Sequence, residues 1–129
     1  MKLLLDTHTF LWWAIEPDRL PPAILELMKN PANKIVFSVV SAWEAQIKIG
    51  LGKLTLSESL KKIVEREIQH NKWEILPVSL QHVWHLLQLP PLHKDPFDRL
   101  LIAQALTEDL TIATGDAFIT NYPGLSVIW

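Results

Sequence analysis

The sequence predicts a three-layer α/β sandwich, in which a five-stranded parallel sheet is flanked by helices. Five short apolar runs rich in strand-forming residues are spread along the chain, and helical patterns fill the gaps between them. Parallel strands need such helical crossovers, whereas a tight hairpin joins only antiparallel strands. No repeat and no Ser/Gly-rich linker divides the chain, so we expect a single domain over residues 1–129.

Local signals place the elements in order along the chain. Strands are expected at residues 2–5, 34–37, 74–78, 111–114 and 125–128. Pro21 and the proline after it open a helix that ends at Asn30. Thr55 and Glu58 match a capping box and predict the start of the next helix, and Ser79 is expected to cap a further one.

Composition excludes several classes of protein. The chain has no cysteine, so it has neither disulfides nor a thiolate zinc site, and we expect a cytoplasmic protein. No apolar stretch approaches the about 18 residues that a membrane-spanning helix needs, so no membrane association is expected. With a formal net charge of -2, the chain lacks the basic surface of a non-specific DNA-coating protein, and a nucleic acid would have to be bound locally.

Most of the acidic residues are expected on the solvated exterior, including Glu65 and Glu67, which share a helix with several basic residues. Four acids lie in apolar sequence surroundings instead: Asp6, Glu44, Asp98 and Asp116. An unpaired carboxylate is costly to bury, so each of these four needs a partner or a function.

Asp6 and Asp116 each follow an expected strand, at the sheet edge where open α/β folds bind ligands. Asp6 could equally cap the helix that its strand leads into. Asp116 comes after Thr114 and Gly115, and an aspartate beside a glycine could simply reverse the chain. The local sequence leaves both interpretations open for both acids.

Glu44 also has two interpretations. It either forms a capping box with Ser41 and an ion pair with Lys48, or it lies inside a helix that begins nearer Ser38. In the second case its carboxylate shares a helix face with apolar residues.

The segment HKDPFDRLLIAQA predicts a helix that starts at Asp95. Asp95 is expected as the N-cap and Pro96 as the first helical residue, with Asp98 at the third position, where the helix dipole favours an acid. Asp98 also reaches the sheet edge if the apolar face of this helix packs on the sheet. Capping explains Asp95, whereas Asp98 serves both purposes only if a cation joins the acids.

Two of the four acids follow strands and two lie near helix starts. In a parallel α/β fold these positions share one edge of the sheet, so we expect the four acids to meet in a single crevice. Carboxylates within about 4 to 6 Å raise each other's pKa unless a positive ion is present. Oxygen ligands, the absence of cysteine and histidines without a metal-binding spacing favour Mg²⁺ or Mn²⁺ over zinc. Such ions usually bind substrate phosphate as well, so we expect a phosphate-bearing substrate.

Four motifs contain these acids in order: LLLDTHTFLW, SVVSAWEAQIK, HKDPFDRLLIAQA and TIATGDAFI. Together they resemble the PIN domain family, in particular the VapC-like toxins of type II toxin-antitoxin pairs, over nearly the whole chain. The resemblance implies a ribonuclease that depends on one or two Mg²⁺ or Mn²⁺ ions, usually forms a homodimer and is inhibited by a separate antitoxin. Lys94 and Ala117 depart from the residues usual in this family, at positions that concern substrate contacts rather than metal binding.

The resemblance also assigns roles to individual residues. Asp6, Glu44, Asp98 and Asp116 match the catalytic and metal-binding acidic quartet, while Asp95 and Thr114 match accessory positions. The ions held by this quartet would activate water for in-line attack on RNA, leaving 5′-phosphate and 3′-hydroxyl ends. The basic residues nearest the quartet in the sequence are expected to contact substrate phosphates: Lys48, Lys53, Lys94 and Arg99.

Three other functions compete with the nuclease interpretation. A signalling receiver domain would need paired acids after the first strand and a lysine late in the chain, which are missing. A haloacid-dehalogenase-like phosphatase would need a second acid where His8 stands. A catalytically silent PIN-like module that binds RNA or protein stays open, because only an activity measurement separates it from a nuclease.

Overall fold

The computed structural model describes residues 1–129 and confirms the predicted α/β fold with one parallel sheet. The strands lie in the order β3-β2-β1-β4-β5. Their bounds are β1 (Lys2–Leu5), β2 (Lys34–Ser38), β3 (Glu74–Leu76), β4 (Thr111–Ala113) and β5 (Ser126–Ile128). Strands β2 and β3 lie on one side of β1, and β4 and β5 lie on the other, so β1 is the central strand.

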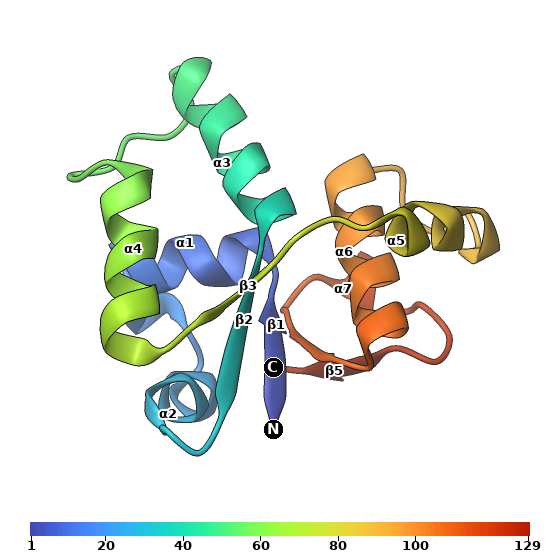
Figure 1. Cartoon of the computed structure of the whole chain (residues 1–129), viewed down its shortest axis with the longest axis horizontal. Helices are drawn as coiled ribbons and strands as arrows, with labels where there is room; N and C mark the ends of the chain where they lie inside the picture. Colours follow the sequence, from blue (N-terminus) through green and yellow to red (C-terminus); the bar gives the residue numbers. More distant parts are fainter.

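Helices cover both faces of the sheet (Figure 1). One face carries α1 (Thr7–Ile15), α2 (Pro22–Lys29) and α4 (Leu60–Asn71). The other carries α6 (Pro96–Glu108) and α7 (Ala117–Thr120), with α5 (Leu80–His85) packed against α6. Helix α3 (Val39–Gly50) continues from β2 beyond the sheet, and two short 3-10 helices are η1 (Pro17–Arg19) and η2 (Leu86–Gln88). None of the helices has the length and hydropathy to cross a membrane.

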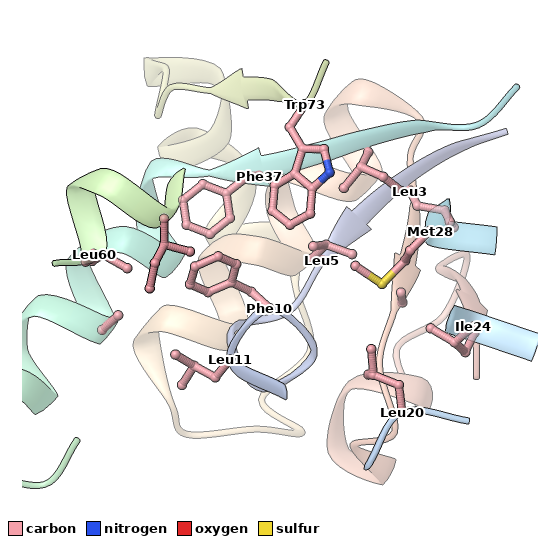
Figure 2. Close-up of a cluster of buried hydrophobic side chains, with 14 residues drawn as sticks. Leu3, Leu5, Phe10, Leu11, Leu20, Ile24, Met28, Phe37, Leu60 and Trp73 are labelled. Carbon is pink, nitrogen blue, oxygen red and sulfur yellow. The ribbon is translucent and has the colours of Figure 1, made fainter. Parts of the chain in front are cut away.

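The central strand β1 is buried on both sides. Because side chains alternate along a strand, Leu3 and Leu5 face one helical layer, where they pack with Phe10 and Phe37 (Figure 2). Leu4 faces the opposite layer and belongs to the second core cluster. Each fully buried leucine contributes about 1.5–3 kcal/mol relative to exposure. This two-sided burial fixes the register of β1 and therefore the place where the strand ends.

The start of α4 differs from the prediction. The capping box of Thr55 and Glu58 is wrong, because the N-cap is Ser59, whose hydroxyl accepts a hydrogen bond from the Lys62 N–H at 3.2 Å. The Glu58 carboxylate instead accepts two hydrogen bonds from the Arg66 guanidinium, at 2.5 and 2.6 Å. Ser59 directly precedes the apolar run of the helix, which makes it the better-placed cap.

Glu67 was also placed wrongly by the sequence pattern. It is only 8% exposed, because it lies one turn after Ile63 on the face of α4 that packs against the core. The Asn71 side-chain amide donates a hydrogen bond to Glu67 Oε2 at 2.5 Å. Glu67 is therefore a buried acid whose partner comes from the next turn of its own helix.

Candidate metal site

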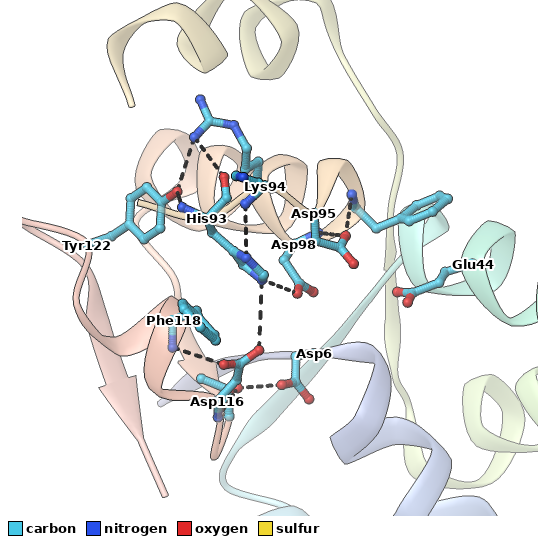
Figure 3. Close-up of polar contacts among 12 residues, drawn as sticks. Asp6, Glu44, His93, Lys94, Asp95, Asp98, Asp116, Phe118 and Tyr122 are labelled. Carbon is cyan, nitrogen blue, oxygen red and sulfur yellow. Dashed lines mark hydrogen bonds and ion pairs between the residues drawn. The ribbon is translucent and has the colours of Figure 1, made fainter. Parts of the chain in front are cut away.

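The predicted acids reach the carboxyl edge of the sheet from four elements. Asp6 directly follows β1, and Asp116 follows β4 at the turn into α7, while Glu44 lies in the middle of α3 and Asp98 in the first turn of α6. Figure 3 shows their side chains pointing toward one shared space. Strands β1 and β4 are neighbours where the strand order reverses direction, which is where open α/β sheets bind ligands.

Two hydrogen-bond donors orient the Asp6 carboxylate. Its Oδ1 accepts from the Thr9 N–H at 2.7 Å, and its Oδ2 accepts from the Thr114 hydroxyl. That hydroxyl also accepts from the Asp116 N–H at 3.0 Å, so Thr114 links the two strand-end acids. Burial raises the pKa of Asp6, against the opposing effect of the hydrogen bonds from Thr114 and Thr9. The capping interpretation of Asp6 is confirmed, because it is the N-cap of α1. Its carboxylate also faces the crevice, and its role as a functional acid stays a prediction.

Asp98 and Asp116 are joined by a histidine that the sequence pattern did not single out. His93 Nε2 lies 2.7 Å from Asp98 Oδ2 and 3.9 Å from Asp116 Oδ2. One ligand atom from each of these three residues lies within 4.8 Å of the others. The sequence shows no metal-binding spacing of histidines, and it did not indicate that His93 meets two of the acids. The sequence does not show that His93 approaches the acids, because His93 lies on an irregular segment and meets Asp116 only in the folded chain. The one available signal was its place in the HKDPFD motif.

Glu44 lies inside α3 and does not form the capping box with Ser41. The N-cap of α3 is Ser38, whose hydroxyl accepts from the Val40 N–H at 3.0 Å. Glu44 is 7% exposed, and the Lys48 ammonium lies 3.3 Å from its Oε2. Its Oε1 is buried and has no hydrogen-bond partner. A buried carboxylate oxygen without a donor is costly, so this atom indicates a position for a cation.

Negative charge is concentrated around Asp98. Burial is the main cause that raises the pKa of Asp98 to about 6, the His93 hydrogen bond opposes it, and the charges of Asp95 and Glu44 raise it further. Asp95 caps α6 as predicted, since its Oδ1 accepts from the N–H groups of Phe97 and Asp98 at 2.8 and 3.0 Å. The charge repulsion and the unpartnered Glu44 oxygen both fit a hard divalent cation held by the four carboxylates.

The predicted phosphate-binding residues differ in their surroundings. The Arg99 guanidinium donates to the carbonyl oxygens of Leu86 and Pro90, at 3.1 and 3.0 Å, and to the Tyr122 hydroxyl at 3.1 Å. These bonds anchor the segment that precedes α6, and phosphate binding by Arg99 stays a prediction that competes with them. Lys48 is paired with Glu44, and the two remaining residues of this set are exposed: Lys53 and Lys94.

A cleft of about 270 Å³ adjoins the strand-end acids, lined by Asp6, His8, Thr9, Trp12, Gly115, Asp116 and Trp129. Gly115 permits a close approach here, because a Cβ at this position would lie 2.6 Å from the Trp129 indole. The rings of Trp12 and Trp129 have centroids 5.8 Å apart. The cleft next to Asp6 and Asp116 is therefore lined by two aromatic rings, those of Trp12 and Trp129.

Solved structures of other proteins share the fold of this chain. The solved structure of VapBC2 from Rickettsia felis bound to a promoter DNA fragment has a TM-score of 0.74 at 21% identity, covering 99% of this chain and 98% of that chain. DNA-bound VapBC from Salmonella typhimurium has a TM-score of 0.70 at 19% identity, with coverages of 99% and 97%. FitAcB from Neisseria gonorrhoeae has a TM-score of 0.64 at 20% identity, with coverages of 98% and 96%. At these identities the likeness shows a shared fold.

Sequence comparison assigns the chain to a family but finds no similar curated protein. A comparison with curated proteins gives no match. The model of the PIN domain family, in contrast, matches residues 3–125, which include all four acids of the site. The match covers nearly the whole sheet and its helices, and this chain therefore belongs to the PIN domain family.

Proposed function

We propose that this chain is a metal-dependent endoribonuclease and the toxin of a type II toxin-antitoxin pair. The observation that carries the proposal is the buried Glu44 Oε1 without a hydrogen-bond partner, near Asp98, whose pKa burial raises to about 6. Such an arrangement becomes favourable when a divalent cation neutralises it. Membership of the PIN domain family and the structural likeness to VapBC and FitAcB support the same function.

The carboxylates of Asp6, Glu44, Asp98 and Asp116 hold one or two Mg²⁺ or Mn²⁺ ions in this proposal. When bound, the ion supplies Lewis acidity that activates water and stabilises charge on the scissile phosphate. Two accessory residues orient the acids: Thr114 bonds Asp6 and the Asp116 backbone, and Asp95 fixes the first turn of α6 that carries Asp98. No side chain is required as a nucleophile.

The proposed substrate is RNA, contacted through its phosphates by basic residues around the crevice. Lys94 follows His93 directly and is exposed, and Lys53 is exposed beyond the end of α3. Lys48 and Arg99 complete the proposed set, although each already has partners in the protein. Contacts to phosphate alone carry no sequence information, so they position the strand rather than select it.

The proposed partners are a second copy of the chain and a separate antitoxin protein. Large apolar side chains lie exposed on α3 and α5 and just after each of them, where they support the presence of partner surfaces: Trp43, Leu51, Leu80, Trp84 and Leu87. Light scattering coupled to size-exclusion chromatography is expected to give the mass of two chains. A monomer at all accessible concentrations would contradict the homodimer.

Incubation of the pure protein with structured and single-stranded RNA tests the activity. We expect cleavage with Mn²⁺ or Mg²⁺, no cleavage with a chelator, and products that carry 5′-phosphate and 3′-hydroxyl ends. Asp6→Asn, purified in parallel, is the matched control, because the amide keeps the size of the side chain and removes its charge.

Two results would contradict the proposal. Cleavage that survives both the chelator and Asp6→Asn would come from a contaminating nuclease. RNA retention without cleavage under any metal condition would favour the catalytically silent binding module instead. Induced expression in a bacterial host gives an independent readout, because growth arrest by the wild type and not by Asp6→Asn is expected only of a nuclease toxin.

A further inference from the structure

His93 lies in the site, but the proposed mechanism gives it no role. It belongs to the segment between η2 and α6, and its ring stacks on Phe118, with centroids 5.2 Å apart and planes 16° apart. Its Nε2 approaches Asp98 and Asp116 at 2.7 and 3.9 Å (Figure 3). It therefore lies at the edge of the crevice, directly against two of the four acids.

The side chains of Tyr122 and Arg99 anchor the backbone of His93. The Tyr122 hydroxyl accepts a hydrogen bond from the His93 N–H at 2.9 Å. The Arg99 guanidinium donates to the same hydroxyl at 3.1 Å, and to the carbonyl oxygens of Pro90 and His93 at 3.0 and 3.5 Å. An irregular segment is thus held in one conformation, and the imidazole has a defined position.

The hydrogen bonds of the ring determine its tautomer. The Lys94 backbone N–H donates to His93 Nδ1 at 3.1 Å. A backbone N–H can only donate, so Nδ1 presents its lone pair and Nε2 carries the hydrogen. His93 Nε2 is therefore the donor to Asp98 Oδ2 at 2.7 Å. In this tautomer Nε2 has no lone pair to offer a metal ion.

We propose that His93 is a positioning residue of the metal site, whose Nε2–H holds Asp98 Oδ2 and leaves Asp98 Oδ1 available to the ion. No other protein group donates to this carboxylate. Outer hydrogen bonds of this kind orient a ligating group before the metal binds, and their loss typically lowers metal affinity about 10- to 100-fold. This inference rests on the proposed function, because it requires Asp98 to bind the ion.

Isothermal titration of the folded protein with Mg²⁺ and with Mn²⁺ tests this role without any activity measurement. His93→Ala is expected to raise the Kd of both ions by the same factor, about tenfold or more. His93→Gln recovers part of the affinity, because its amide can donate to the same carboxylate. His70→Ala is the matched control, since His70 is an exposed histidine at the end of α4 and its loss should change neither Kd.

A graded variant separates positioning from simple disruption of the fold. Tyr122→Phe removes only the hydroxyl that bonds the His93 N–H and the Arg99 guanidinium. It should weaken both ions by a smaller factor than His93→Ala. Circular dichroism of each variant confirms that the protein is folded at the titration temperature.

Three results would overturn the inference. If His93→Ala weakens Mn²⁺ much more than Mg²⁺, the imidazole is a ligand, because nitrogen donors favour the transition metal. If His93→Ala binds both ions more tightly, the imidazole blocks the site in the metal-free protein. If affinities stay unchanged, His93 has no role toward the ion. Failure of the proposed function gives a different result. In that case the wild type would bind neither ion, or Asp98→Asn would bind the ions as tightly as the wild type.

Discussion

Two glutamates in separate regions are buried to nearly the same extent but differ in their partners. Glu67 of α4 is 8% exposed, and its Oε2 accepts a hydrogen bond from the Asn71 amide at 2.5 Å. Glu44 of α3 is 7% exposed, and its Oε1 has no donor at all. The first carboxylate is satisfied within its own helix, whereas the second faces a crevice that it shares with Asp98 (Figure 3).

This difference shows that burial of an acid does not by itself mark a functional site. A buried carboxylate is tolerated once its oxygens are paired, and a local partner one turn away is sufficient. The unpaired Glu44 Oε1 lies near other acids, where a cation is the partner that fits. The two glutamates are therefore a matched pair on which the proposed metal site can be tested.

The largest expected difference concerns RNA cleavage. Glu44→Gln removes a proposed metal ligand and should lower the cleavage rate about 100-fold or more, as losses of transition-state charge stabilisation do. Glu67→Gln makes the same chemical change on α4, away from the crevice, and should leave the rate unchanged. Initial rates on one RNA at saturating Mn²⁺ measure both. Equal losses in the two variants would remove the distinction between these regions.

The next effect is stabilisation by metal. A divalent cation at about 100 times its Kd should stabilise the native wild type by about 2.7 kcal/mol, because it binds only the folded state. Asp98→Asn should lose most of the resulting rise in Tm, and Glu67→Gln should keep it. Thermal unfolding with and without Mn²⁺ gives the shift. A full shift in Asp98→Asn would show that the ion binds elsewhere.

A pH profile of the metal-free protein should separate the crevice from the rest of the chain. The pKa of Asp98 is raised from 3.8 to about 6, so the native state binds more protons than the unfolded state between these values. Stability should therefore fall as the pH rises from about 4 to about 6 through this residue. Denaturant unfolding at several pH values should show a smaller fall in Asp98→Asn, whereas Glu67→Gln should retain it. A profile unchanged by Asp98→Asn would contradict the assignment.

The smallest expected effect is on the stability of the metal-free protein at neutral pH. Glu67→Gln weakens a charge-assisted hydrogen bond to Asn71 and should cost about 1 kcal/mol. Glu44→Gln removes a buried charge that has one unpartnered oxygen, and it also loses the Lys48 ion pair, worth about 0.3–0.5 kcal/mol, so stability should be unchanged or higher. Urea titrations measure both differences. Strong destabilisation by Glu44→Gln would mean that this carboxylate is structural.

Much of the fold was predictable because its signals are local. The apolar runs that became β1, β2 and β4 are bounded by polar residues, and the helix starts at Ser79 and Asp95 were identified from capping patterns. The capping box at Thr55 failed, because a local pattern cannot show that Glu58 is taken by Arg66, two helical turns farther on. Where two capping signals compete, as at Thr55 and Ser59, contacts with later turns of the helix determine which residue is the cap.

The four acids of the site were also predictable, and their environments were not. Strand-end and helix-start positions indicated that Asp6, Glu44, Asp98 and Asp116 share one edge of the sheet, because parallel strands end there together. The same patterns placed Glu67 in solvent and left His93 out of the site. Periodicity shows which side of a helix is apolar, but it does not show how far a polar side chain reaches or what it meets.

By itself, the sequence determined the class of fold, the order of its elements and the identity of four acids in apolar sequence surroundings. Only the tertiary structure decided that Glu67 is buried, that Glu44 Oε1 has no donor, and that the His93 ring lies between Asp98 and Asp116. The physical reason is that secondary structure depends on neighbours within about one helical turn or one strand pair. The solvation and hydrogen bonding of a buried charge depend instead on groups that only the folded chain brings within about 4 Å.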